Sequence, residues 1–416
     1  MKSTKKRLNG KIAATIAFTV LACLIACNAL ADSTRGITDK SVKIGINAPL
    51  SRLLAHAGKA SVDALQAYFN YINETKGGVH GRKIELITAD HQYEPSRSLA
   101  EFKKLVTRNK VMSVIGWGTP PVTILKKPAN LEKVPMLCVS GGTSLFNPPT
   151  RYVAAMITPY SLQAAAVVTY IVEKLGDKQP KIGLFYNNDD FGNAGRKGVE
   201  MAAKHYGFKI LAKSPNITGS PIDKSSVTRF KREGIKYLLV AAHSGDVSSL
   251  LLEAKSQNLD CDFYGVLSPA SDRKIVLQAK EAAKRYFSVD SQGRWSDTKN
   301  PGIAKMIEIT KKYGRAEELD AKSYYYIIGW YPALFIVEAL ERAGKDLTVE
   351  KFVDAWNTFD KWEADKIVPP ISLNPKRRVM SLGGIICKTN LEKEDLLPVS
   401  DWIEAPEEIT KLVLGK

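Results

Sequence analysis

Hydroxyl side chains and glycines meet in one short stretch, where Ser140 is followed by two glycines and then by Thr143 and Ser144. Glycine lets a backbone approach a bound molecule closely, and hydroxyl and backbone N–H groups together hydrogen-bond an anion. The stretch closes the apolar segment 136–140, which is typical of a buried strand. We therefore expect Ser140, Gly142, Thr143 and Ser144 to contact a small acidic ligand, with an ordinary turn as the alternative.

Trp117 and Thr119 stand in a similar position, at the end of the apolar segment 111–117. Thr119 followed by Pro120 is typical of an N-cap and the first helical residue. Backbone N–H groups and the positive end of a helix dipole would then face a ligand carboxylate. The alternatives are that Thr119 only caps its helix and that Trp117 fills the core instead of stacking on a ligand.

Catalytic chemistry finds little support in the residue types. The chain has no GxSxG, HExxH or GxxxxGK[ST] motif, and no cysteine or histidine spacing typical of a zinc site. A nucleophile and its base can come together from distant segments, so the motifs alone leave an enzyme open as a remote alternative. We expect a protein that is not an enzyme and has no cofactor and no bound metal.

The elements that must position these residues alternate between short apolar segments and helical patterns, which favours strand–helix–strand units on parallel sheets. The first series predicts strands at 42–48, 83–90, 111–117 and 136–140, and helices at 58–73, 95–108 and 120–131. The second predicts helices at 161–175, 192–206, 225–233 and 245–258, and strands at 181–187, 208–214, 235–242 and 262–267. Then follow a strand at 286–289, helices at 301–313, 322–343 and 349–359, and strands or turns at 371–374 and 379–388. The predicted fold class is α/β, with two doubly wound, Rossmann-like lobes.

The first thirty-one residues have the pattern of an export signal: a basic start, an apolar run at 12–27, and the small residues Ala29 and Ala31. Cleavage after Ala31 would release a free periplasmic protein. The sequence LIAC at 24–27 also resembles a lipoprotein box, in which Cys27 would be lipidated and anchor the chain to the membrane. The apolar stretch 324–337 contains Pro332, and we interpret it as a buried core helix.

Charge and cysteine content exclude further classes. The formal charge is +17, from 60 Lys and Arg against 43 Asp and Glu, but the basic residues are spread along the chain. We therefore expect a solvated surface and no nucleic-acid binding. Cys138, Cys261 and Cys387 follow the export signal; Cys138 has the setting of a buried strand residue, and a Cys261–Cys387 disulfide is left open.

Several segments, in order, resemble the leucine/isoleucine/valine-binding protein family, the periplasmic substrate-binding proteins of ABC importers. They include VKIG at 42–45, APLS at 48–51, YIN at 71–73, GGV at 77–79, GRKI at 81–84, VIG at 114–116, SGGTS at 140–144 and DDFG at 189–192. Together they cover nearly all of the chain after the export signal.

The resemblance implies a type I periplasmic-binding fold, in which two lobes are joined by a three-crossover hinge. We place the crossovers near Pro159, Val289 and Ile371, so that lobe 1 comprises 38–159 with 290–370 and lobe 2 comprises 160–289 with 371–416. The implied partners are a small-molecule ligand and ABC permease subunits in the inner membrane, and the implied state is a monomer.

In this family the loop matching 140–144 supplies the main contacts to a ligand carboxylate, and Phe191 matches a tyrosine that covers the ligand. The chain departs from the pattern at Ser268, which stands where an acid commonly pairs the ligand's ammonium group, and at Ala57 and Pro120. A buried, uncompensated ammonium is costly. A branched-chain amino acid and a ligand without an amine, such as an aromatic or aliphatic carboxylate, an amide or urea, therefore stay open.

The predicted function is capture of such a molecule in an interlobe cleft and its delivery to an ABC permease; a ligand-sensing module that docks on a membrane receptor is the alternative. The predicted ligand-binding residues are Ser51, Trp117, Thr119, Ser140, Gly142, Thr143, Ser144, Phe191, His243 and Ser268.

Overall fold

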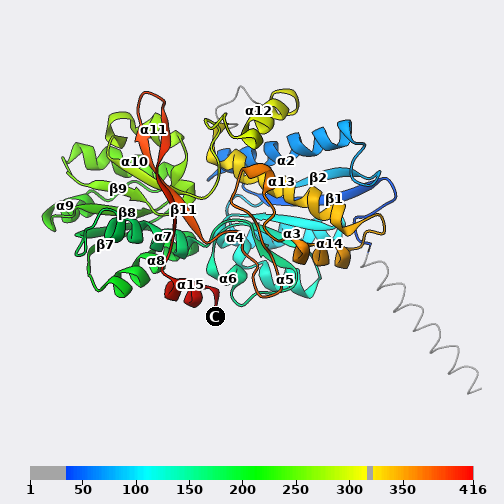
Figure 1. Ribbon diagram of the computed structural model, residues 1–416, viewed down its shortest axis with the longest axis horizontal. Coiled ribbons are helices and arrows are strands. Elements are labelled where there is room, and N and C mark those ends of the chain that lie inside the picture. The colour runs from blue at the N-terminus through cyan, green and yellow to red at the C-terminus, as the bar shows by residue number, and fades with distance from the viewer. Residues whose placement is uncertain (1–33, 316–321, 416) are drawn as a thin grey trace, which may run out of the picture.

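The computed structural model describes residues 34–315 and 322–415 of the chain, and Figure 1 shows two α/β lobes side by side. The predicted export signal at 1–31 and the lipidation site at Cys27 lie outside the described residues. Each lobe carries one sheet with helices packed against it. The predicted α/β fold class with two lobes is therefore confirmed.

Lobe 1 contains a five-stranded parallel sheet with the order β2-β1-β3-β4-β5. Its strands are β1 (Ser41–Ala48), β2 (Lys83–Asp90), β3 (Ser113–Trp117), β4 (Met136–Val139) and β5 (Val153–Ala155). Its helices are α2 (Ala55–Thr75), α3 (Pro95–Thr107), α4 (Thr119–Thr123), α5 (Lys126–Leu131), α6 (Thr143–Phe146), α12 (Pro301–Tyr313), α13 (Tyr324–Ala343) and α14 (Val349–Ala355). Residues of β3 and β4 are buried throughout, as expected of parallel strands covered on both faces.

Lobe 2 contains a seven-stranded sheet with the order β12-β11-β10-β9-β8-β6-β7. Its strands are β6 (Ile182–Asn187), β7 (Ile210–Asn216), β8 (Tyr237–Ala241), β9 (Asp262–Gly265), β10 (Tyr286–Asp290), β11 (Gly383–Asn390) and β12 (Asp395–Glu404). Its helices are α7 (Tyr160–Thr169), α8 (Asp190–Tyr206), α9 (Lys224–Arg232), α10 (Ser244–Ser256) and α11 (Lys274–Ala279). The last two strands are antiparallel and return from the final quarter of the chain.

Both lobes are assembled from distant parts of the chain. The chain passes between the sheets after β5, after β10 and again before β11. In lobe 1, Ser61 Oγ of α2 donates to the backbone oxygen of Tyr325 in α13 at 2.8 Å. In lobe 2, Val289 of β10 pairs with Ile386 of β11. A last helix, α15 (Glu407–Leu414), lies at the junction, where Asn147 of lobe 1 donates to its Val413 and His205 of lobe 2 pairs with its Glu408.

Local chemistry explains where α8 begins, ends and packs. The Asp189 side chain accepts from Gly192 N, which satisfies a backbone donor of the first turn. Gly207, at φ 74°, ends the helix in the left-handed conformation that glycine adopts readily. A side chain at Gly198 would collide with the backbone of Ser161, so this glycine lets α8 lie against α7.

Several predicted elements differ from the structure. The predicted helix 120–131 is divided into two short helices. Pro128 has no backbone N–H, so it cannot donate the helical hydrogen bond to the backbone oxygen of Ile124. The second-lobe helix predicted at 161–175 widens into a π-helical turn at Tyr170–Lys174. Residues 371–374 form only isolated bridges, and the strand predicted from 379 begins at Gly383. The sequence interpretation did not include β5, β12 or α15.

Two further expectations concern buried segments. Helix α13 is buried along most of its length, as predicted for a core helix, and no helix among residues 34–315 and 322–415 is long and apolar enough to cross a membrane. Cys138, Cys261 and Cys387 are all buried and free. The structure thus has no Cys261–Cys387 disulfide; these two cysteines are instead packed into the apolar interior of lobe 2.

Candidate functional site

The two lobes meet where their parallel strands end, which is the usual place for a ligand in open α/β sheets. Tyr93, three residues beyond β2, brings its hydroxyl within 3.0 Å of His243 Nε2, two residues beyond β8. Both side chains are buried. This hydrogen bond joins lobe 1 to lobe 2 at the centre of the junction.

The turn after β2 holds Tyr93 in place. Asp90 accepts hydrogen bonds from Leu50 N, Ser51 Oγ and Gln92 N, and these bonds keep the pKa of its carboxyl low against the opposing effect of burial. His91 Nδ1 accepts from Tyr93 N, and the other ring nitrogen lies 3.0 Å from the backbone oxygen of Trp117. His91 is therefore a neutral positioning residue, and its burial lowers its pKa to about 4.

His243 presents an aromatic face and a polar edge to the junction. Its ring stacks on Phe191 with centroids 4.1 Å apart and an interplanar angle of 12°. Phe191 in turn meets Tyr160 edge-on at 5.0 Å. Burial lowers the pKa of His243 to about 4, so the imidazole is neutral at neutral pH. Its Nδ1 has no hydrogen-bond partner among the described residues.

The loops after β3 and β4 form a hydroxyl-rich edge of the junction. Thr119 Oγ1 and Ser140 Oγ share a hydrogen bond at 2.8 Å, and both side chains are buried. A Cβ on Gly142 would lie 2.8 Å from Thr119 Cγ2, so glycine is required for this close approach. Thr119 is not the N-cap that the sequence suggested. Gly118 occupies that position, no side chain caps α4, and the hydroxyl of Thr119 pairs with Ser140 instead.

The start of α13 closes a second side of the junction. Tyr324 Oη lies 2.8 Å from Ser268 Oγ and Tyr325 Oη lies 3.5 Å from Ser244 Oγ, so two tyrosines of lobe 1 bond to serines of lobe 2. The Ser268 backbone N–H donates to Gln163 Oε1 at 2.6 Å. These contacts, like that of Tyr93, join groups without formal charge.

Two acidic side chains near this junction, Asp246 and Asp189, are engaged within lobe 2. Asp246 accepts from Asn187 Nδ2 at 2.8 Å and from Gly219 N at 3.0 Å, and its burial raises the pKa of its carboxyl. Asp189 caps α8 and also accepts from Thr218 Oγ1 at 2.9 Å. Neither carboxylate has the role of a free partner for a ligand ammonium group.

A cavity of about 630 Å³ adjoins the junction. Lobe 1 contributes Thr119, Gly142, Thr143 and Ser144 to its wall, and lobe 2 contributes the side of α8 that includes Asn193. Helix α15 closes one end of it. Thr143 Oγ1 lies 3.2 Å from Ser161 Oγ of lobe 2, whereas the Ser144 side chain is exposed.

The predicted residues therefore fall into separate groups. Trp117, Phe191, His243 and Ser268 lie in the buried junction, although the Trp117 indole N–H already donates to Ser61 Oγ. The second group lines the adjoining cavity and consists of Thr119, Gly142, Thr143 and Ser144. Ser140 lies beside this group because its hydroxyl is bonded to Thr119. Ser51 belongs to neither group, because its hydroxyl is bonded to Asp90 at 2.6 Å.

Six junction residues were missed by sequence reasoning: Tyr93, Tyr160, Gln163, Ser244, Tyr324 and Tyr325. Tyr93 carried a usable signal, since it follows the carboxyl end of a predicted strand. Tyr324 and Tyr325 did not, because the apolar helix that follows them indicates core.

The pattern of the periplasmic binding protein family matches residues 41–381. The leucine-, isoleucine-, valine-, threonine- and alanine-binding protein of Pseudomonas aeruginosa is 21% identical over 327 residues, covering 77% of this chain and 83% of that protein. The Leu/Ile/Val-binding protein of Escherichia coli K12 is 22% identical over 249 residues, covering 59% of this chain and 66% of that protein, slightly less than two thirds.

Solved structures share the fold over most of their length. A branched-chain amino acid ABC transporter protein from Thermus thermophilus with bound valine superposes with a TM-score of 0.80 at 23% identity, covering 87% of this chain and 96% of that chain. A fatty acid ABC transporter substrate-binding protein from Thermomonospora curvata gives a TM-score of 0.78 at 25% identity, covering 89% and 94%. With its two crossover-linked lobes and its matched sequence pattern, the chain belongs to the periplasmic binding protein family, as the resemblance to the Leu/Ile/Val-binding proteins predicted.

Proposed function

We propose that this protein is the solute-binding component of an ABC importer, that it is exported to the periplasm, and that it binds its ligand between the lobes without changing it chemically. The observation that carries the proposal is the set of neutral hydrogen-bonding groups that both lobes direct to one junction, above all Tyr93 and His243. A molecule that bonds to both lobes favours their closed arrangement by its differential affinity for it.

The ligand we propose is a small carboxylic acid without an ammonium group. The hydroxyl-rich edge at Thr119 and Ser140 suits a carboxylate, and His243 Nδ1 is a buried polar atom that a ligand can satisfy. Asp189 and Asp246 are engaged, and Ser268 is neutral, so none of these three side chains offers a free charged partner to an amine. Phe191 and His243 favour an aromatic or branched apolar body. Among the relatives, one binds amino acids and another is a fatty acid binding protein by name.

The test compares pairs of molecules that differ only in the amine: leucine with 4-methylpentanoate, and phenylalanine with 3-phenylpropanoate. Binding to the native state alone raises the melting temperature, and a ligand at 100 times its Kd contributes about 2.7 kcal/mol. We expect the amine-free member of a pair to give the larger shift in ligand-stripped protein. A larger shift with leucine would contradict the proposed ligand, and no shift with any of the four would contradict the carboxylic acid class.

Variants connect the shift to the junction. Replacing Phe191→Ala or His243→Phe removes the stacked pair or its polar edge, and we expect either change to reduce the shift to below a third. Tyr326→Phe is the matched control, because the Tyr326 hydroxyl bonds to Thr310 within lobe 1, at 2.8 Å. A ligand shift that survives both junction variants would place the ligand elsewhere.

A further inference from the structure

A second cavity, of about 580 Å³, lies at the hinge, and none of the junction residues described above lines it. Three stretches line it: the crossover 290–300, the segment 363–370 that precedes the last crossover, and the hairpin of β11 and β12. The crossover and the second stretch are tied together, since Gly293 N donates to the backbone oxygen of Ile367. The wall therefore contains segments of both lobes.

The sides of this hinge cavity are apolar. Ile367 and Val368 form the wall on the lobe 1 side, and Ile385, Leu397 and Trp402 form the wall on the lobe 2 side. Ile385, Leu397 and Trp402 are only partly buried by the protein. Cavities of this size with apolar walls and a few polar groups are typical of small-molecule sites.

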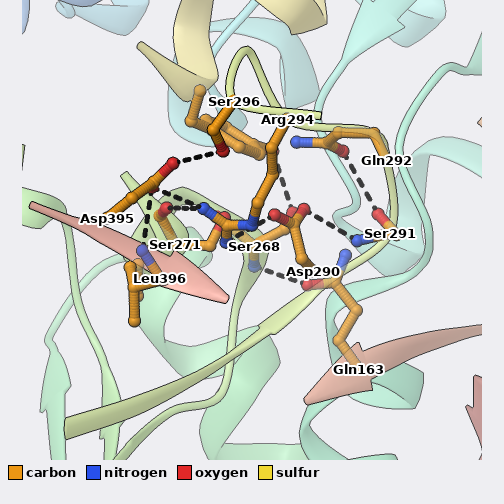
Figure 2. Close-up of polar contacts among 12 residues, drawn as sticks. Gln163, Ser268, Ser271, Asp290, Ser291, Gln292, Arg294, Ser296, Asp395 and Leu396 are labelled. Atoms are coloured by element: carbon orange, nitrogen blue, oxygen red, sulfur yellow. Dashed lines mark hydrogen bonds and ion pairs between the residues drawn. The ribbon is translucent and has the colours of Figure 1, made fainter. Parts of the chain in front are cut away.

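The polar end of the hinge cavity is built around Arg294 (Figure 2). The guanidinium is ion-paired with Asp290 at 2.7 Å and with Asp395 at 3.3 Å, and it also donates to the backbone oxygen of Ser271 at 3.2 Å. Ser296 Oγ donates to Asp395 at 2.5 Å, and Leu396 N donates to the same carboxylate at 2.8 Å. Two carboxylates thus surround one guanidinium, and the cluster has a formal charge of −1.

The atoms left without a hydrogen-bond partner at this end are donors. Arg294 Nε and Gln292 Nε2 are both buried and have none among the described residues. The Cys387 thiol lies beside the guanidinium, but sulfur is only a weak acceptor. Buried donors are normally satisfied, so a bound molecule that supplies an acceptor atom would complete this end of the cavity.

The charge of the cluster then selects among acceptors. The charged side chains that line the cavity are Asp290, Asp297 and Glu363 against Arg294 and Lys366. A carboxylate or phosphate would therefore be opposed by the carboxylates, which outnumber the cations. An ammonium group would be attracted to the carboxylates but has no lone pair for the two donors. An uncharged oxygen, as in an alcohol, ketone or amide, satisfies both conditions.

We propose that the hinge cavity is a second binding site, which takes an uncharged molecule with an apolar body and one acceptor oxygen. Such a molecule touches segments of both lobes, so its binding favours the lobe arrangement that forms the cavity. The site has its own lining residues, distinct from those of the junction, so a molecule bound in it does not compete for the junction.

The test uses three probes of equal length, 1-octanol, octanoate and octylammonium, and measures their saturable binding by ligand-observed NMR. We expect 1-octanol to bind at least tenfold more tightly than either charged probe. Leu397→Trp fills the cavity and should weaken 1-octanol at least tenfold. Leu211→Trp, on the partly exposed strand β7 at the far edge of the same sheet, is the matched control and should change the affinity less than twofold.

A second variant keeps the test valid if Leu397→Trp does not fold. Gln292→Leu removes one of the donors at nearly constant volume and should weaken 1-octanol at least threefold. His243→Phe, which changes a residue outside the cavity, should retain 1-octanol binding and weaken it far less than Leu397→Trp does. Equal binding in Leu397→Trp and Leu211→Trp, equal affinity for octanoate, loss of binding in His243→Phe, or no saturable binding to the native chain would each overturn the proposal.

Discussion

The junction and the hinge cluster both join parts of the molecule through buried polar groups, but with opposite chemistry. Tyr93, Tyr324 and their partners are neutral, and each makes a single hydrogen bond across the lobes. Arg294 is an ion held between Asp290 and Asp395. A neutral hydrogen bond contributes about 0.5–1.5 kcal/mol net, whereas breaking a buried ion pair costs about 3–5 kcal/mol.

This difference matches what each region has to do. The junction contacts must break and form again as a ligand enters and leaves, so weak, exchangeable bonds suit them. The hinge cluster fixes the second crossover to β12. Because separating its ions is costly, the cluster keeps its geometry while the lobes move. We therefore interpret the junction as the mobile contact of the molecule and the hinge cluster as its fixed point.

The largest expected effect is at the hinge. Arg294→Met leaves two buried carboxylates unpaired and should lower the free energy of unfolding by about 3–5 kcal/mol. Urea denaturation measures the change. Arg196→Met breaks the half-buried pair with Glu200 and should cost less than about 1 kcal/mol. Combining Arg294→Met with Asp290→Asn and Asp395→Asn should recover most of the loss; equal losses in Arg294→Met and Arg196→Met would refute the fixed point.

The pH dependence of stability separates the two regions by sign. His91 and His243 have pKa values of about 4 in the folded protein, so the unfolded state binds more protons between pH 4 and 6.5 and stability rises with pH there. Burial raises the pKa of Asp290 to about 6, although Arg294 opposes this shift. The protonated Asp290 therefore contributes fully to the stability of the folded state below pH 4, and this stabilisation is lost as the pH rises through 6.

Each of these groups can change the free energy of unfolding by up to about 1.4 kcal/mol per pH unit. We expect His243→Gln to flatten the rise in stability between pH 5 and 6.5 and Asp290→Asn to steepen it. Urea midpoints at a series of pH values measure both slopes. Slopes that change in the same direction would show that the junction and the hinge do not differ as the structure indicates.

Smaller effects are expected from the hydrogen bonds across the junction. Tyr93→Phe and Tyr324→Phe each remove one bond between the lobes and should shift the open–closed equilibrium by about 0.5–1.5 kcal/mol toward open. Distances between spin labels on the two lobes report this shift. Tyr326→Phe, whose bond lies within lobe 1, should leave the distances unchanged. If Tyr326→Phe increases the distances between the lobes as much as the two junction variants do, the junction hydrogen bonds have no specific role in lobe closure.

The smallest effect is expected at α15. Its Glu408 pairs with His205 on the surface at 3.2 Å, and the carboxylate side is 84% exposed. Glu408→Gln should change the free energy of unfolding by less than about 0.5 kcal/mol. Thermal unfolding at low salt measures the change. A loss similar to that of Arg294→Met would mean that α15 also fixes the lobes.

Much of the fold was predictable because strands β2 and β6 and helices α12 and α13 carry strong local patterns. The positions where strands end also located Trp117, Ser140 and His243 near the junction. The contacts between these groups were not predictable. Tyr93 and His243 are 150 residues apart, and only the closed arrangement of the lobes brings them together.

The hinge cluster had no signal in the sequence. Residues 290–300 are polar, and polar segments are ordinarily exposed loops. Arg294 is buried because β11 and β12 return to cover it, and the sequence pattern did not predict that β12 exists. Its partner Asp395 comes from β12 itself, so neither the ion pairs nor the hinge cavity could be inferred without the hairpin.

The discontinuity of both lobes has a consequence for how the polypeptide folds as it is made. The sheet of lobe 1 ends at Ala155, but its covering helix α13 is synthesised only after residue 323. The sheet of lobe 2 lacks β11 and β12 until residue 404 has emerged, which leaves β10 as an unpaired edge. Neither lobe can complete its native contacts before these late elements have been synthesised. The emerging polypeptide therefore remains incompletely folded, and able to pass through a narrow channel, until β12 is present.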